Sequence, residues 1–190
     1  MLDLIANLGD DCVKHLDPRS IYLEDGGKAK VLCGDTNVFD PPLVNFGTQK
    51  YGQLHLEKEY ARFLTPLRAS LVLTNGSKEQ TLQKPEDNDS RGQLLWDLGI
   101  ILYELASGNM HPFANQNTLV SARLIKYYHV AFPVNMENEV SGHLKDLIFQ
   151  LLMKNVSERI GFVDSVAKAE EADSKIVQSV QDVKNHLFFK

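Results

Sequence analysis

The stretch from Leu94 to Gly108 is apolar on nearly every side and predicts a central helix. Its sequence, LLWDLGIILYELASG, places apolar side chains around almost the full circumference of a helix. A helix of this kind must be surrounded by other elements, because none of its faces can be left to water. The run is too short, and too interrupted by Asp97 and Glu104, to cross a bilayer, which needs about 20 apolar residues. Ser107 and Gly108 are typical of a helix end.

Before this helix the pattern is weaker. Leu2 to Val13 has apolar spacing compatible with a short helix, although Gly9 and two aspartates weaken it. Residues 20–33 form two β-prone runs around Asp25-Gly26-Gly27, which predicts a β-hairpin with a glycine turn. From Gly34 to about Arg91 no period is sustained, so we expect mainly loops with one or two short helices, such as Leu56 to Phe63.

After the central helix, two further helices are predicted. Residues 118–128 suit a helix, and in residues 142–154 leucine and isoleucine recur at i, i+3, i+4, i+7 and i+8. The polar stretch 165–186 should be helical in part. The charged cluster of residues 84–89, which precedes the central helix, is expected to be solvated loop.

Composition and charge exclude several classes of protein. The 190 residues are 43% hydrophobic and 24% charged, which is typical of one soluble globular domain. A formal net charge of −5 without a basic stripe argues against a nucleic-acid surface. Two cysteines, Cys12 and Cys33, are too few for a disulfide framework, and the N-terminal residues do not resemble a signal peptide. We therefore expect a cytoplasmic protein that does not enter a membrane.

The central helix also carries a motif. Trp96–Leu105, followed by Gly108 and His111-Pro112-Phe113, resembles the segment Asp-x-Trp-Ser-Leu-Gly-x-x-x-Tyr-Glu-Leu…Gly…Pro-Phe of eukaryotic protein kinases. Residues 144–161 and 183–189 look like the closing third of the C-terminal lobe (C-lobe) of a serine/threonine kinase. The resemblance implies a mainly α-helical kinase C-lobe with one small β-hairpin. It also implies structural roles for Trp96, Gly99 and Arg159.

The resemblance divides the chain, residues 1–190, as a single C-lobe. Residues 1–33 correspond to an opening helix, a degenerate catalytic loop and the hairpin. Residues 34–92 correspond to an aberrant activation segment with an insertion, and residues 93–190 to the helical subdomain. The resemblance implies that the phosphate-binding N-terminal lobe (N-lobe) of a kinase is not contained in residues 1–190, and the sequence holds no Gly-x-Gly-x-x-Gly.

The family's catalytic positions are substituted in this alignment. Kinases need an Asp to orient the substrate hydroxyl, a nearby Lys, and an Asn and an Asp that hold magnesium. Without gaps these positions fall on His15, Asp17, Ser20 and Cys33, respectively. Asp35 takes the metal position only if the hairpin is two residues longer than usual. We therefore expect no catalytic residue, no cofactor and no bound metal.

The activation segment also departs from the family. Either Gly47–Tyr51 or Thr65-Pro66-Leu67 can be aligned with its end, and neither register supplies the Glu that pairs with Arg159 in the family. A buried guanidinium without a partner would be costly. Another carboxylate, Glu57 or Glu59, is therefore expected to reach Arg159.

One hydrogen bond of the family is also expected to be lost. In kinases an Asp at the start of the central helix accepts a hydrogen bond from the catalytic-loop backbone. That position falls on Leu94, which cannot accept one. The loop is therefore predicted to lack its usual tether.

Some candidate chemistry has a structural alternative. Cys12, His15 and Cys33 could be zinc ligands, but a structural zinc site wants four ligands, and buried thiols usually behave as small hydrophobes. His15 is in principle a general base. Tyr103 and the run Tyr127-Tyr128-His129 are interpreted as core or helix-packing groups rather than a ligand box.

Two functions compete on this evidence. The first is a catalytically inactive, pseudokinase-type module that binds a protein partner. The second is the C-terminal part of a longer, divergent serine/threonine kinase that binds ATP and transfers phosphate. For the first, Leu2, Leu4, Ile5 and Tyr22 are the candidate partner face, engaged by another protein or by a missing N-lobe.

Overall fold

The structure, a computed structural model, describes residues 16, 21–23, 25, 29–31, 64–74, 88–115, 117–136, 139–162 and 181–190. The helices are α2 (Pro66–Thr74), α3 (Asn88–Ala106), α4 (Thr118–Tyr127) and α5 (Gly142–Leu151), and the strands are β1 (Ile21–Leu23) and β2 (Ala29–Val31). Short 3-10 turns are η4 (Val134–Met136), η5 (Val156–Glu158) and η6 (Leu187–Phe189). Within these ranges, no helix is both long and apolar enough to span a membrane.

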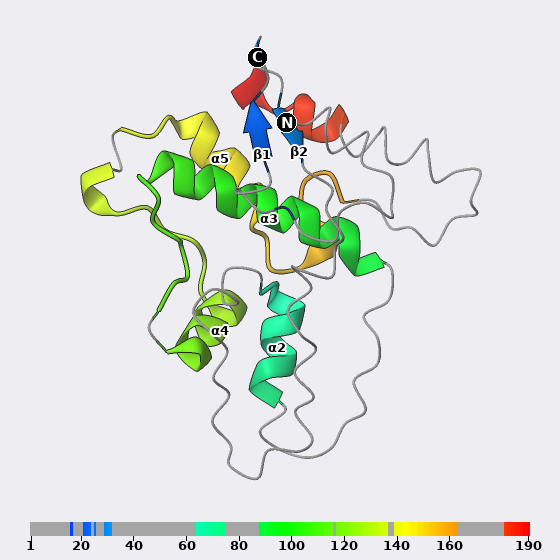
Figure 1. The fold of residues 1–190 in the computed structure, drawn as a ribbon, viewed down its shortest axis with the longest axis vertical. Coiled ribbons are helices and arrows are strands. Elements are labelled where there is room, and N and C mark those ends of the chain that lie inside the picture. The colour runs from blue at the N-terminus through cyan, green and yellow to red at the C-terminus, as the bar shows by residue number, and fades with distance from the viewer. Residues whose placement is uncertain are drawn as a thin grey trace, which may run out of the picture.

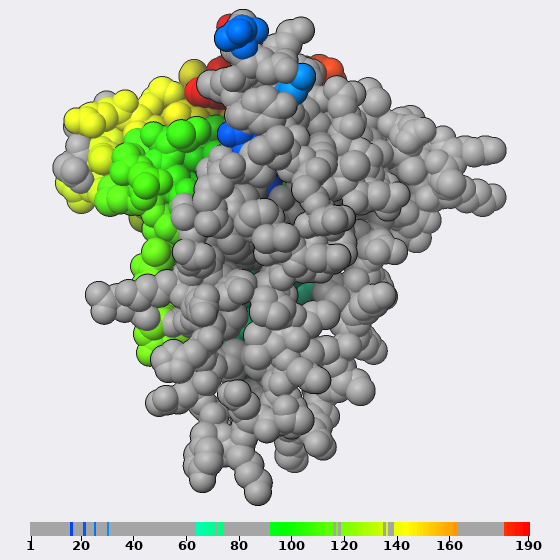
Figure 2. All heavy atoms as spheres, in the orientation of Figure 1, coloured from blue at the N-terminus to red at the C-terminus, as the bar shows by residue number. Residues whose placement is uncertain are grey.

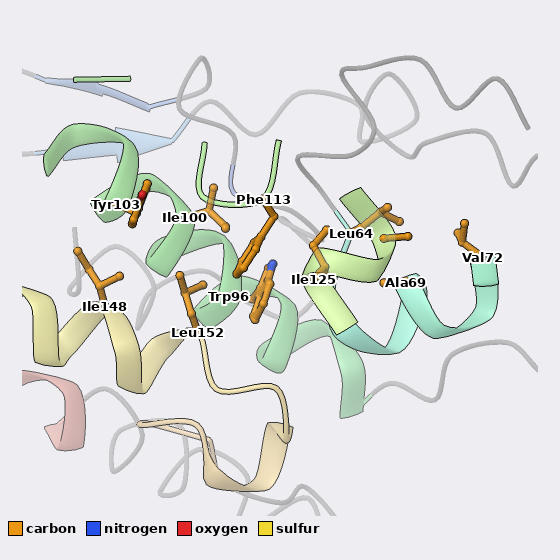
Figure 3. Close-up of a cluster of buried hydrophobic side chains, with 11 residues drawn as sticks. Leu64, Ala69, Val72, Trp96, Ile100, Tyr103, Phe113, Ile125, Ile148 and Leu152 are labelled. Carbon is orange, nitrogen blue, oxygen red and sulfur yellow. The ribbon is translucent and has the colours of Figure 1, made fainter. Parts of the chain in front are cut away.

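Helix α3 is the centre of the fold, as predicted. Figure 1 shows α5 alongside it and the pair α2 and α4 on the other side. One buried cluster surrounds Trp96, Ile100 and Tyr103 and joins α3 to α2, α4 and α5 (Figure 3). A second cluster joins α3 to Leu16, α5 and Val183. Since both clusters include side chains of α3, the helix is apolar on two opposite sides.

The start of α3 was predicted too late. It begins at Asn88 rather than near residue 94, so residues 88 and 89 are helical and not loop as expected. Gly92 and Gln93, although not apolar, are buried there. A Cβ at Gly92 would lie 2.5 Å from Cγ2 of Val156, so Gly92 is buried because the side chain of Val156 packs directly against its backbone.

The C-terminal end of α3 lies where the sequence places it. Gly108 and Asn109 take positive φ angles of 70° and 72°. The N–H of Asn109 donates to the carbonyl of Glu104 at 2.6 Å, and the N–H of Ser107 to that of Tyr103 at 2.8 Å. This left-handed cap satisfies helix carbonyls that would otherwise lack partners.

Helix α2 was not predicted individually within residues 34–91. The N–H of Arg68 donates to Oγ1 of Thr65 at 3.3 Å, so Thr65 caps the helix, and Pro66 occupies its first position. Both are favourable there because a cap accepts an orphan N–H and proline has none to satisfy. The pair Thr65-Pro66 was the signal that could have located this helix.

Helices α4 and α5 confirm the two predictions made for residues 118–154, with one correction. The side chain of Asn117 caps α4, and Ser141 caps α5. Helix α5 ends at Leu151 instead of residue 154. The chain leaves the helix here because the carbonyl of Met153 accepts from Nε and Nη2 of Arg159, at 3.2 and 2.9 Å.

The hairpin is also confirmed. Strands β1 and β2 pair antiparallel, with Ile21 opposite Val31 and Tyr22 opposite Lys30. Ile21 is partly buried against the Leu16 cluster. The hairpin is therefore packed on α3 through Ile21.

The aromatic residues at the end of α4 are exposed, which contradicts the prediction that they pack in the core or against a helix. Tyr127 and Tyr128 are 64% and 62% exposed, and His129 is exposed. They lie at and beyond the end of α4, whose inner side is formed by Ala122 and Ile125.

In Figure 2 the described surface on the left of the molecule belongs to the green and yellow segments that contain α3, α4 and α5.

Candidate functional site

Most of the predicted site residues lie outside the described residues. These are His15, Asp17, Ser20, Cys33 and Asp35 at the catalytic positions, Leu2, Leu4 and Ile5 of the candidate partner face, Cys12 of the zinc alternative, and Glu57 and Glu59. The backbone of Tyr22 lies in β1, but its side chain is outside the description. Among the described side chains, no three His, Cys, Asp or Glu residues are grouped as metal ligands.

Leu16 is the described residue closest to the catalytic positions, since its sequence neighbours are His15 and Asp17. Its side chain is 1% exposed and packs in the second cluster. Its backbone N–H donates to Oδ2 of Asp97 at 2.9 Å, and Nε2 of Gln93 donates to Oδ1 of the same carboxylate at 2.7 Å. The chain here is therefore tethered to α3 by Asp97 and not through the usual position, 94.

Arg159 is buried against the side of α3 that carries Gly92 and Trp96. It is 4% exposed, and its Nη1 donates to the carbonyl of Gly92. Its Nε and Nη2 both donate to the carbonyl of Met153. Its Cζ lies 5.2 Å from the centre of the Trp96 ring. The guanidinium thus joins the start of α3 to the loop after α5.

Lys154 lies beside the same tryptophan. Its Nζ is 3.9 Å from the centre of the Phe113 ring and 5.0 Å from that of Trp96. Burial, with the nearby charge of Arg159 adding to it, lowers the pKa of Lys154 to about 7. Within the described structure its Nζ is buried and has no hydrogen-bond partner. The two aromatic faces are therefore its main electrostatic partners.

Gly99 and Tyr103 join α3 to its neighbours in two different ways: Gly99 leaves room for close packing, and Tyr103 makes a hydrogen bond. A Cβ at Gly99 would lie 2.7 Å from Cδ2 of Leu152, so only glycine leaves room for α5. The hydroxyl of Tyr103 donates to the carbonyl of Ala131 at 2.8 Å, and burial raises the pKa of this phenol. Together with Trp96, these motif positions serve packing.

A histidine–aspartate pair fastens the end of the chain to α5. Nε2 of His186 lies 3.0 Å from Oδ2 of Asp146, and Nδ1 of the same ring accepts from the N–H of Phe188 at 3.2 Å. An Nδ1 that accepts carries no proton, so Nε2–H donates to the carboxylate. Sequence reasoning missed this pair, as it missed the roles of Asp97 and Lys154, because each has a partner far away in the sequence: Asp146 for His186, Leu16 for Asp97 and Phe113 for Lys154.

Comparison with curated proteins finds kinases. The chain is 40% identical to flippase kinase 1 of Saccharomyces cerevisiae over 95 residues, which is 50% of this chain and 9% of that protein. It is 35% identical to testis-specific serine/threonine-protein kinase 1 of Mus musculus over 66 residues, 35% of this chain and 17% of that protein. It is 36% identical to serine/threonine-protein kinase ppk22 of Schizosaccharomyces pombe over 96 residues, 50% of this chain and 15% of that protein.

This chain contains a serine/threonine protein kinase-like region. The helix-rich structure fits the mainly α fold of a kinase C-lobe, which confirms the predicted fold class. The kinase-like region spans less than a fifth of each of these three relatives. No protein-family model matches the chain.

Proposed function

We propose that the kinase-like region transfers no phosphate and serves as a protein-interaction or regulatory module. The observation that carries the proposal is a contrast between two sets of positions. Positions that pack the fold hold buried residues that contact their neighbours, such as Trp96, which stacks on Phe113, and Arg159, which donates to the carbonyl of Met153. The positions that the resemblance assigns to catalysis hold His15, Asp17 and Cys33 instead of the required groups.

The chemistry of the substitutions supports the loss of phosphotransfer. The family's catalytic Lys neutralises charge on the moving phosphoryl group, whereas Asp17 would place a second negative charge beside it. Magnesium prefers oxygen ligands, so the thiol of Cys33 is a poor replacement for Asp. His15 and Ser20 likewise lack the carboxylate and the amide of the family.

The test is thermal unfolding of the whole chain with and without Mg-ATP. A ligand at 100 times its Kd stabilises the native state by about 2.7 kcal/mol, which corresponds to about 5–10 °C in Tm for a protein of this size. We expect no such shift, and no phosphate transfer to a generic substrate protein. A nucleotide-binding kinase measured in parallel is the positive control. A clear rise in Tm would instead support the alternative, a divergent kinase segment that binds ATP.

The proposed interaction face consists of Leu2, Leu4, Ile5 and Tyr22. It is proposed because these side chains are apolar or aromatic and would be covered by the N-lobe in a two-lobed kinase. The same preparation tests it through the binding of an apolar dye and through oligomeric state. Leu4→Asp should reduce dye binding or dissociate an oligomer. The control is Leu105→Asp, since Leu105 is a 73% exposed leucine of α3 and belongs to no proposed face. A monomeric chain that binds no dye would refute this part of the proposal.

A further inference from the structure

We propose that Asp97 is a positioning residue for the chain that enters the β-hairpin. Its carboxylate replaces, one helical turn along α3, the tether that the kinase resemblance assigns to position 94. This inference does not depend on the function proposed above, because a tether holds the backbone whether or not the chain transfers phosphate.

The contact has the features of a specific anchor. The N–H of Leu16 and Oδ2 of Asp97 are 2.9 Å apart, although the residues are 81 positions apart in sequence. Leu16 is 1% exposed and Asp97 is 3% exposed, so water does not compete for either group. A hydrogen bond to an ionised acceptor is roughly twice as strong as a neutral one. A buried carboxylate held in this way strongly prefers one backbone position.

A second contact fixes the direction of the carboxylate. Gln93 lies one turn before Asp97 on α3, is 1% exposed, and donates from Nε2 to Oδ1 at 2.7 Å. The oxygens of Asp97 therefore accept from two different donors. Gln93 holds the side chain of Asp97 so that Oδ2 faces Leu16, which makes the acceptor preorganised rather than adaptable.

Helix geometry explains why position 97 can replace position 94. Residues three apart lie on the same side of a helix, so a carboxylate at either position can approach one neighbouring backbone N–H. Leu94 is partly buried against the cluster that contains Leu16. The chain thus keeps an apolar contact at position 94 and moves the acceptor to position 97.

The hydrogen bond between Leu16 and Asp97 lies where the chain before β1 contacts α3. Leu16 and Ile21 both pack in the second cluster, and Ile21 begins β1. Two apolar contacts alone would allow the chain to slide along α3, because apolar packing is not directional. The hydrogen bond to Asp97 fixes which backbone N–H lies at this place, five residues before β1 begins.

The experiment measures hydrogen exchange of the Leu16 amide by NMR in the whole chain. Asp97→Leu removes the acceptor, and the loss of a charged hydrogen bond predicts exchange about 10-fold faster or more. The double variant Asp97→Leu/Leu94→Asp returns a carboxylate to the other position of the same face. It should restore most of the protection of Leu16, a rescue that a merely space-filling role of Asp97 would not give.

A second pair of variants keeps the inference testable if Asp97→Leu does not fold. Asp97→Ala and Glu104→Ala both remove a buried carboxylate from α3, and Glu104 is 5% exposed. Only Asp97→Ala removes the acceptor of the Leu16 N–H, so only this variant should speed exchange at Leu16 relative to amides in the middle of α3. Equal effects of the two variants, or unchanged Leu16 exchange in Asp97→Leu, would overturn the inference. So would a failure of Leu94→Asp to restore protection to a folded Asp97→Leu protein.

Discussion

Substitution of Gly99 by alanine should destabilise the protein, although alanine normally stabilises a helix. The added Cβ would lie 2.7 Å from Cδ2 and 2.9 Å from Cγ of Leu152, and 3.0 Å from Cβ of Leu151. Leu151 and Leu152 are 0% and 3% exposed, so neither side chain can swing into water. Two of the three atoms, Cγ and Cβ, lie close to the backbone. Relief therefore requires α5 to move away from α3.

The magnitude follows from two opposing effects. Alanine in a helix interior is favoured over glycine by about 1 kcal/mol. Overpacking a closely packed core costs about 1–3 kcal/mol, and the short contacts at Gly99 place this site near the upper value. The net loss should be about 2 kcal/mol, which corresponds to a fall in Tm of about 4–8 °C for a domain of this size.

Urea denaturation of matched variants tests this prediction. Gly142→Ala adds the same methyl group to α5, where nothing lies within 4 Å of the new Cβ, so it should not reduce stability. Leu152→Ala alone leaves a cavity and costs about 2–5 kcal/mol, but in Gly99→Ala it also removes the clash. The double variant should therefore be more stable than the sum of the single effects predicts, by about 1 kcal/mol or more. A Gly99→Ala protein as stable as wild type would refute the close packing of α3 and α5.

Two further predictions concern the charged groups beside Trp96. Arg159→Met should lower the free energy of unfolding by about 3 kcal/mol or more, because the buried carbonyls of Gly92 and Met153 lose a charged donor; wild-type stability in urea denaturation would contradict this. For Lys154, the folded pKa of about 7 lies below the usual value of about 10.4, so the unfolded chain binds more protons between these values and stability should rise with pH. Denaturation between pH 7 and 9 should show this rise in stability, and Lys154→Met should weaken it. Tyr103 does not contribute in this range, because its pKa is raised above the usual value for a phenol, so it changes the stability only at higher pH. Equal pH dependence in wild type and variant would show that Lys154 is not the cause.

The sequence predicted the elements whose burial depends on their own side chains. Helix α3 is recognisable because apolar residues cover nearly every side of it. The part of α3 around Gly92 could not be predicted in this way, since Gly92 contacts Val156 and Arg159, which lie far along the chain. Likewise α5 ends early because Arg159 takes the carbonyl of Met153. These boundaries depend on tertiary contacts that no local pattern contains.

Asp97 shows the same limit at the candidate site. In the sequence it interrupts an apolar helix, and this interruption argues against a membrane span but indicates no partner. Its partner, the N–H of Leu16, is a backbone group. Every residue except proline has such a group, so the residue type does not indicate which N–H will bind a carboxylate. A buried carboxylate in an apolar helix is nevertheless a signal, because a charge in that place requires a partner. The resemblance then indicated the kind of partner, a backbone N–H of the preceding loop, but at position 94.

The buried charges around α3 also bear on the choice between the two functions. The carboxylate of Asp97 binds a backbone N–H, and the guanidinium of Arg159 binds two backbone carbonyls. A buried charge that binds backbone groups in this way fixes the positions of the chain segments that carry them. Contacts of this kind hold the shape of the region whatever residues occupy its catalytic positions. This is the condition under which a kinase-like surface can serve recognition without chemistry, and it is why the Mg-ATP measurement and the Asp97 variants probe separate properties of the region.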